Sequence, residues 1–150
     1  MQEREAIIPE EGALPLVYAC SGCSGAAQLA NGIAVRLDRD GLAEMSCIAG
    51  VGGDVPAILK LARSGRPIVV LDGCRLHCAR NCLRRHAIAA TLHIDLSCEG
   101  VRKRMHGEVP EDEAQRVWAS VVLPRLNKME HDGCQGCSDY AQAIVAGEIR

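Results

Sequence analysis

The 150-residue sequence predicts a Rossmann-like α/β fold of three layers, in which helices cover both faces of a mostly parallel sheet of about four strands. Two observations support this prediction. Four short apolar runs alternate with longer segments whose apolar residues recur at helical spacing, as in βαβ units. The length and the 48% hydrophobic content suit one globular domain, which we assign to 1–150, with a core of about 14–106 and C-terminal helices over 110–150.

The first half of the chain contains two strand-helix units. The run 14–20 predicts a buried strand that stops at a Gly-rich turn, and apolar residues over 26–37 predict a helix that ends before Gly41. We expect a second strand over 42–48 and a loop over 50–53. Asp54 is a candidate N-cap for the following helix, and Gly65 is placed to end it.

The second half continues the same alternation. The run 68–71 predicts a third strand, and 75–86 predicts a helix because it is rich in helix formers and lacks Gly and Pro. Residues 91–98 alternate apolar and polar side chains, which indicates a strand at a sheet edge. A helix over 110–129 should be kinked or split by Pro124, and Ser138 can cap a last helix.

Composition and charge exclude several classes of partner. The formal charge is −2, too balanced to indicate a nucleic-acid or anionic-membrane surface, and a total of three aromatic residues argues against a base-stacking platform. No apolar run approaches the roughly 18 residues of a membrane span, and the first five residues do not resemble a signal peptide. We therefore expect a cytoplasmic protein, in which clustered thiols indicate metal or redox chemistry.

Nine cysteines are the unusual feature of the composition. Cys20, Cys47, Cys74 and Cys98 each end a predicted strand, with separations of 27, 27 and 24 residues. Because parallel strands end at the same edge of a sheet, we expect these thiols to converge on the rim where α/β folds bind ligands. Taken alone, Cys98 is interpreted as a core residue.

A second cysteine pattern runs from the end of the third predicted strand into the helix predicted over 75–86. Cys74, Cys78 and Cys82 recur every four residues, so they would form a row on one helical face that could chelate a tetrahedral Zn²⁺. Because thiolates around one divalent ion leave excess negative charge, donors are expected nearby. Arg75, the backbone N–H groups after Cys20 and Cys74, and His77 are candidates, and His77 is alternatively a ligand.

Two Cys-x-x-Cys pairs are less specific, because Cys20–Cys23 and Cys134–Cys137 lie too far apart in sequence for a zinc ribbon. Cys23, at a predicted helix start, also has the setting of a redox cysteine.

The sequence around these cysteines resembles the family named after its Asp-Gly-Cys motif, here residues 72–74. Residues 20–24, 43–53 and 100–104 also resemble segments of that family, so that the resemblance covers about 14–106. The family is described as zinc-binding and of unknown function. The resemblance implies that the zinc ligands are among Cys20, Cys23, Cys47, Cys74, Cys78 and Cys82.

Two hypotheses of function follow from the sequence. The first is a cytoplasmic metal-binding protein in which cysteines at the strand ends hold Zn²⁺ for a structural, sensory or metal-handling role, with an iron-sulfur cluster as an alternative. The second is a thiol redox enzyme or sulfur carrier, in which Cys20 or Cys74 is a low-pKa nucleophile and Cys23 or Cys78 resolves the intermediate. Substrate, reaction, protein partner and oligomeric state are left open by the sequence.

Overall fold

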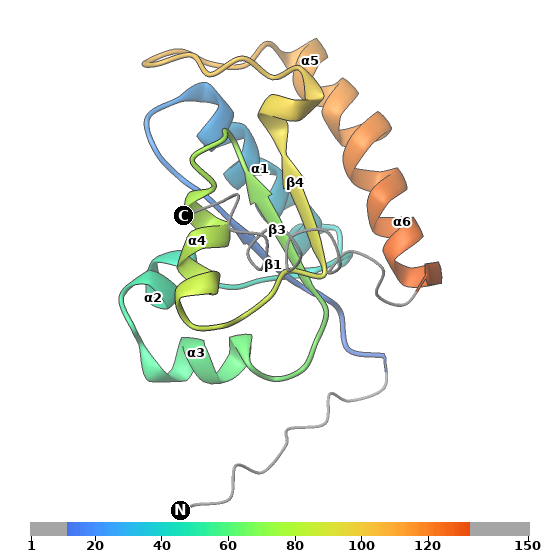
Figure 1. The fold of residues 1–150 in the computed structure, drawn as a ribbon. Helices are drawn as coiled ribbons and strands as arrows, with labels where there is room; N and C mark the ends of the chain where they lie inside the picture. The colour runs from blue at the N-terminus through green and yellow to red at the C-terminus, as the bar shows by residue number, and fades with distance from the viewer. Residues whose placement is uncertain (1–11, 133–150) are drawn as a thin grey trace, which may run out of the picture.

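The computed structural model describes residues 12–132 and contains a four-stranded parallel sheet. The strands are β1 (Leu16–Ala19), β2 (Glu44–Met45), β3 (Ile68–Asp72) and β4 (Leu92–Asp95), in the order β2-β1-β3-β4 (Figure 1). β4 is an edge strand, as its alternating sequence predicts. The chain leaves β1 in one direction and passes back over it to reach β3, so β1 and β3 flank the topological switch point, where open α/β sheets bind ligands.

Helices cover both faces of the sheet, which confirms the predicted α/β architecture. On one side lie α2 (Ile48–Gly52), α3 (Pro56–Ala62) and α4 (Cys78–Arg85), with α4 packed on β3 (Figure 1). On the other side α1 (Gly25–Arg39) packs on β1 and β3, and α6 (Leu123–Asp132) packs on β4. α5 (Glu111–Val117) leads into α6 through a π-helical turn, Trp118–Val122, which splits the segment just before Pro124 as predicted.

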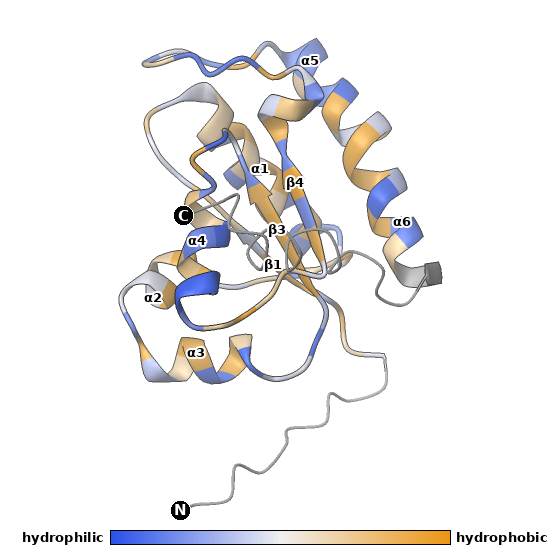
Figure 2. Cartoon of the chain, in the orientation of Figure 1, coloured by the Kyte–Doolittle hydropathy of each residue, from blue (hydrophilic) through white to orange (hydrophobic). Residues whose placement is uncertain are grey.

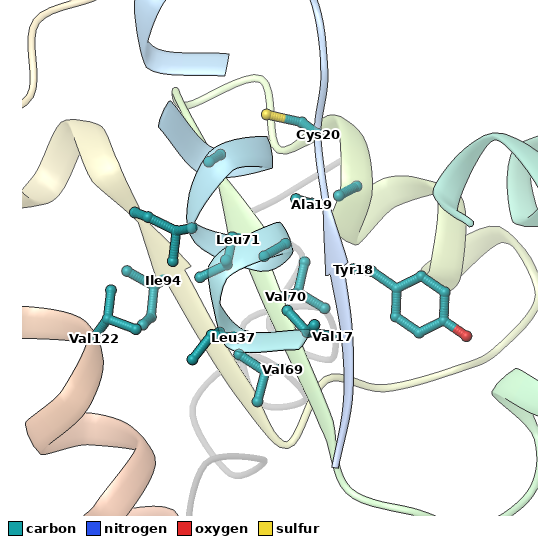
Figure 3. Packing of buried hydrophobic residues seen from close by; sticks show 14 of the residues in the cluster. Val17, Tyr18, Ala19, Cys20, Leu37, Val69, Val70, Leu71, Ile94 and Val122 are labelled. Atoms are coloured by element: carbon teal, nitrogen blue, oxygen red, sulfur yellow. The ribbon is translucent and has the colours of Figure 1, made fainter. Parts of the chain in front are cut away.

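The core consists mostly of small and aliphatic side chains, together with Tyr18 and Trp118, because the chain has only three aromatic residues. Every residue of β1 and β3 is buried, and in Figure 2 apolar colouring marks β3 as well as parts of α3 and of the helical segment leading into α6. Figure 3 shows Leu37 of α1 beside the sheet, near Ile94 and Val122, whereas Tyr18 points to the opposite face. Burial on both faces explains why these strands are uninterrupted apolar runs.

The second unit differs from the prediction. Residues 42–48 form a strand only at Glu44–Met45, and the expected loop over 50–53 belongs mostly to α2. The Cys47 sulfur accepts a hydrogen bond from Gly50 N at 3.3 Å and so caps α2. Asp54 is not a helix cap, because it has φ +61° and binds Arg85 and His86. Pro56 instead begins α3, and Gly65 follows its end at φ +82° as predicted.

Two element boundaries also shift cysteines away from their predicted positions. α4 begins at Cys78, because the backbone of His77 is left-handed (φ +50°). Cys74 therefore lies in the preceding loop. The predicted helical row contains only Cys78 and Cys82. β4 ends at Asp95, whose carboxylate accepts a hydrogen bond from Ser97 N and caps the 3₁₀ turn Leu96–Glu99. Cys98 therefore lies exposed in that turn, neither ending a strand nor entering the core.

The expected helix after Ser138, like Cys134 and Cys137, lies outside the described residues.

Gly73 should be the glycine least tolerant of substitution at the switch point. A Cβ there would lie 2.6 Å from the carbonyl carbon of Ala26 and 2.8 Å from Ala27 N, both backbone atoms of α1. We expect Gly73→Ala to lower the free energy of unfolding by about 1–3 kcal/mol in urea titrations. The matched control is Gly32→Ala in α1, where a Cβ meets no atom and should stabilise the helix by about 0.5–1 kcal/mol. Equal stability of Gly73→Ala and the wild type would contradict this packing.

Candidate thiolate site

Three loops meet at the rim formed by the carboxyl ends of β1 and β3. Residues 20–24 follow β1, residues 73–77 follow β3, and residues 100–107 precede α5. Gly73 N donates to Cys20 Sγ at 3.2 Å, and Lys103 Nζ donates to Cys74 Sγ at 3.6 Å. Gly25 N donates to Arg104 O at 2.9 Å. The rim is therefore a single packed junction in which segments distant in sequence share contacts.

Each residue of the Asp-Gly-Cys tripeptide has a separate role at this junction. Asp72 is fully buried, and its carboxylate accepts hydrogen bonds from Ala79 N at 2.9 Å and Arg80 N at 3.2 Å. It thus caps α4 from the preceding strand, a task that the left-handed His77 does not perform. Gly73 allows close contact with α1, and Cys74 carries the sulfur.

Two histidines bound to carboxylates join the ends of β3 and β4. His93 Nε2 lies 2.9 Å from Asp72, His77 Nε2 lies 2.7 Å from Asp95, and the two rings meet edge to face at 4.8 Å. Burial opposes ionisation of Asp95, but hydrogen bonds from Ser97 and His77 outweigh it and hold the pKa of this carboxyl below its usual value. The network fixes the loop that carries Cys74. The sequence did not reveal it, although the polar alternation of 91–98 places His93 and Asp95 on one face.

Several thiols at the rim lie close enough to influence the ionisation of one another. Burial raises the pKa of the Cys20 thiol to about 11. The hydrogen bond from Gly73 N–H lowers this pKa, but by less than burial raises it. Asp72, Cys78 and Cys74 each raise it slightly further. Burial and the neighbouring Cys78 likewise raise the pKa of Cys82. The prediction of Cys20 as a low-pKa nucleophile is therefore wrong for this arrangement, because its thiol is stabilised over its thiolate.

The remaining sequence-predicted cysteines lie around this group. Cys47 caps α2, and α2 packs on α4 so closely that a Cβ on Gly52 would lie 3.3 Å from Cys82 Sγ. Cys23 is exposed in the loop after β1. All seven cysteines between residues 12 and 132 are free thiols.

The hydrogen-bond donors to sulfur differ from those expected. Cys20 accepts from Gly73 N, Cys47 from Gly50 N and Cys74 from Lys103 Nζ. His77 binds Asp95 instead of a sulfur. The signal for Lys103 was present in the basic run 102–104, but only the fold brings this loop to Cys74. Within residues 12–132, no group of three or more His, Cys, Asp or Glu side chains is placed to hold a metal ion.

Within the same range, no helix is both long and apolar enough to cross a membrane.

The fold and the rim together define a doubly wound α/β protein with free thiols gathered at its switch point. The chain belongs to the DGC domain family, whose model matches residues 16–121. It is 60% identical over 113 residues to the anaerobic and virulence modulator AnvM of Pseudomonas aeruginosa PAO1, a match that covers 75% of this chain and 85% of that protein. No solved structure matches the chain.

The raised pKa of Cys20 predicts slow alkylation in the metal-free protein. Because only the thiolate reacts, iodoacetamide at pH 7 should modify the exposed Cys23 and Cys78 well before Cys20. Modification of Cys20, measured by mass spectrometry of peptides, should accelerate as the pH rises toward about 11. Urea-unfolded protein, in which all thiols are exposed, is the control. Alkylation of Cys20 as fast as Cys78 in the folded state would contradict the burial argument.

Proposed function

We propose that this protein binds Zn²⁺ through cysteine thiolates at the rim of the sheet and uses this centre in a sensory or modulating role. Cys20, Cys74 and Cys78 are the proposed central ligands, and Cys23, Cys47 and Cys82 are the candidates for the remaining position. The observation that carries the proposal is that three of these sulfurs, on Cys20, Cys47 and Cys74, each accept a hydrogen bond from an N–H donor.

The donor set suits thiolate ligation. Zn²⁺ prefers sulfur and nitrogen ligands, and four thiolates around it carry an excess charge of −2 that nearby donors offset. Two of the observed donors are backbone amides held in place by the fold, and the third is an ammonium group. Burial is the main cause of the raised pKa of Cys20 and Cys82, neighbouring thiols add to it, and a bound cation would oppose both effects.

Side-chain rotation is the step that ligation requires. Cys20 is held under Gly73, whereas Cys74 is half-buried and Cys78 is exposed on the first turn of α4. We propose that the Cys74 and Cys78 side chains turn toward Cys20 around the ion, with α4 kept in place by Asp72.

A modulating role fits the family relationship. The relative from P. aeruginosa is named as an anaerobic and virulence modulator, and zinc bound by thiolates is released when those sulfurs are oxidised. We propose that the protein acts in the reducing cytoplasm, where its free cysteines would persist.

Thiol chemistry at Cys74 is the second candidate function, and one contact favours it. Lys103 Nζ lies 3.6 Å from Cys74 Sγ, so a thiolate there would have a cationic partner. In this alternative the Cys74 thiolate attacks a disulfide substrate, one substrate thiolate leaves, and a mixed disulfide with Cys74 forms. The Cys78 thiolate then attacks Cys74 Sγ, the second substrate thiolate leaves, and the product is a Cys74–Cys78 disulfide and a reduced substrate. With a persulfide substrate, Cys74 takes up the outer sulfur, and Cys78 expels it as hydrosulfide.

Metal content decides between these functions. Protein purified anaerobically should contain zinc in stoichiometric amount by elemental analysis, and Cys74→Ser and Cys78→Ser should each lose most of it because thiolate ligands are removed. Cys98→Ser is the matched control, since Cys98 lies exposed in the turn after β4. Unchanged zinc in Cys78→Ser would remove this residue from the ligand set.

Two other outcomes would overturn zinc binding. A brown protein containing iron and sulfide would indicate an iron-sulfur cluster. Metal-free protein that forms a reversible Cys74–Cys78 disulfide, abolished in both serine variants, would establish the thiol function.

A further inference from the structure

The rim also carries a surface patch that shares only Lys103 with the thiolate site. Leu76 and Met105 are the two most exposed large hydrophobic residues of the described chain, at 64% and 55% exposure. Leu76 lies in the loop after β3, and Met105 lies in the loop that precedes α5. Both loops are ordered by specific contacts, so this exposure is a feature of the fold.

The two loops are held next to each other. The Lys103–Cys74 contact joins them, and Leu76 and Met105 are each two residues from one end of that contact. Met105 is also fixed by a β-bridge to Ser24, and the turn of Leu76 is closed by the hydrogen bond from His77 N to Cys74 O. Two apolar side chains thus project from one junction.

Basic side chains lie on the same two loops as these apolar residues. Arg75, Arg102 and Lys103 are exposed on the same two loops, and neither Arg75 nor Arg102 forms an ion pair with a carboxylate in the part of the chain described. Residues 75–104 carry seven Lys or Arg and two Asp or Glu, a formal +5 in a chain of −2, so the other residues carry −7. Two of these cations pair with carboxylates outside the range, Arg85 with Asp54 and Arg104 with Glu113, and four acidic residues follow over 108–113. The basic character of the rim therefore rests on the exposed Arg75, Arg102 and Lys103.

We propose that the rim has a docking surface for a peptide segment of a partner protein, a segment that is acidic and also carries apolar side chains. This surface, here termed the rim patch, consists of Arg75, Leu76, Arg102, Lys103 and Met105. Exposed apolar anchors surrounded by charge of one sign are typical of a recognition surface. The positive charges would attract the partner and the apolar pair would anchor it. A nucleic acid is disfavoured, because Tyr18 and Trp118, the two aromatic residues between positions 12 and 132, are both buried.

A synthetic peptide tests this chemistry even while the natural partner is unidentified. Fluorescence anisotropy would compare a labelled 12-residue peptide of Glu-Glu-Leu repeats with two matched peptides, one with Lys for Glu and one with Ser for Leu. The full chain is used with reductant and EDTA, so that the result does not depend on zinc. We expect the Glu-Glu-Leu peptide to bind at least about tenfold more tightly than either control at physiological ionic strength.

Variants locate the binding on the rim patch. Leu76→Ser and Met105→Ser should each weaken binding at least about fivefold, and Arg75→Glu with Arg102→Glu should abolish it. The controls are Leu14→Ser and Arg39→Glu, which make the same changes at exposed positions before β1 and at the end of α1, away from the rim. Thermal melting of every variant separates lost binding from lost folding.

Three results with the peptides would overturn the proposal. These are absence of binding at millimolar peptide, equal binding of the Glu-Glu-Leu peptide and its matched controls, and unchanged binding by Leu76→Ser and Met105→Ser. Binding of single-stranded DNA as tightly as the acidic peptide would also overturn it, by assigning the patch to nonspecific polyanion attraction. None of these results bears on the zinc content, so the two proposals fail independently.

Discussion

The arrangement of the rim depends on the buried carboxylate of Asp72. It lies at the end of a fully buried strand, where an unpartnered charge would be costly, and it is satisfied by two amide N–H groups of α4 and by His93. The three bonds hold the start of α4, and thus Cys78, at a fixed place relative to β3. Because Gly73 follows directly and rests on the backbone of α1, the same tripeptide also holds Cys74 next to Cys20.

The histidine contacts extend this constraint to the edge strand. His93 and Asp95 come from β4, Asp72 from β3 and His77 from the loop between β3 and α4, so the network connects three segments. Its groups are paired with one another, whereas Cys20 and Cys74 at the same rim are free thiols. Free thiols with fixed N–H donors are the common basis of both candidate functions, and charge balance distinguishes them. A cation at the centre would stabilise thiolates that burial disfavours, whereas redox chemistry would use Cys74, whose sulfur accepts from Lys103 Nζ.

The positions of charged residues in the fold say more about possible partners than the net charge of the chain does. The formal charge of −2 argued against a nucleic-acid or anionic-membrane surface, yet the exposed Arg75, Arg102 and Lys103 lie on two loops that the Lys103–Cys74 contact joins. A balanced total is compatible with a charged patch, because the sum carries no information about which residues become neighbours. The same reasoning applies to Leu76, which is apolar in sequence but held outside the core by the left-handed turn at His77.

The sequence by itself determined the parallel sheet and its layers, because the buried runs of β1 and β3 and the periodicity of α1 are local signals that burial reinforces. It also determined that Cys20 and Cys74 share a rim, since this follows from parallel strands alone. Only the tertiary structure decided the beginning of α4, the capping role of Cys47 and the contact of Lys103 with Cys74. Those features depend on hydrogen bonds whose geometry is set by the folded chain, such as those from α4 to Asp72, and such bonds leave no periodic trace in the sequence.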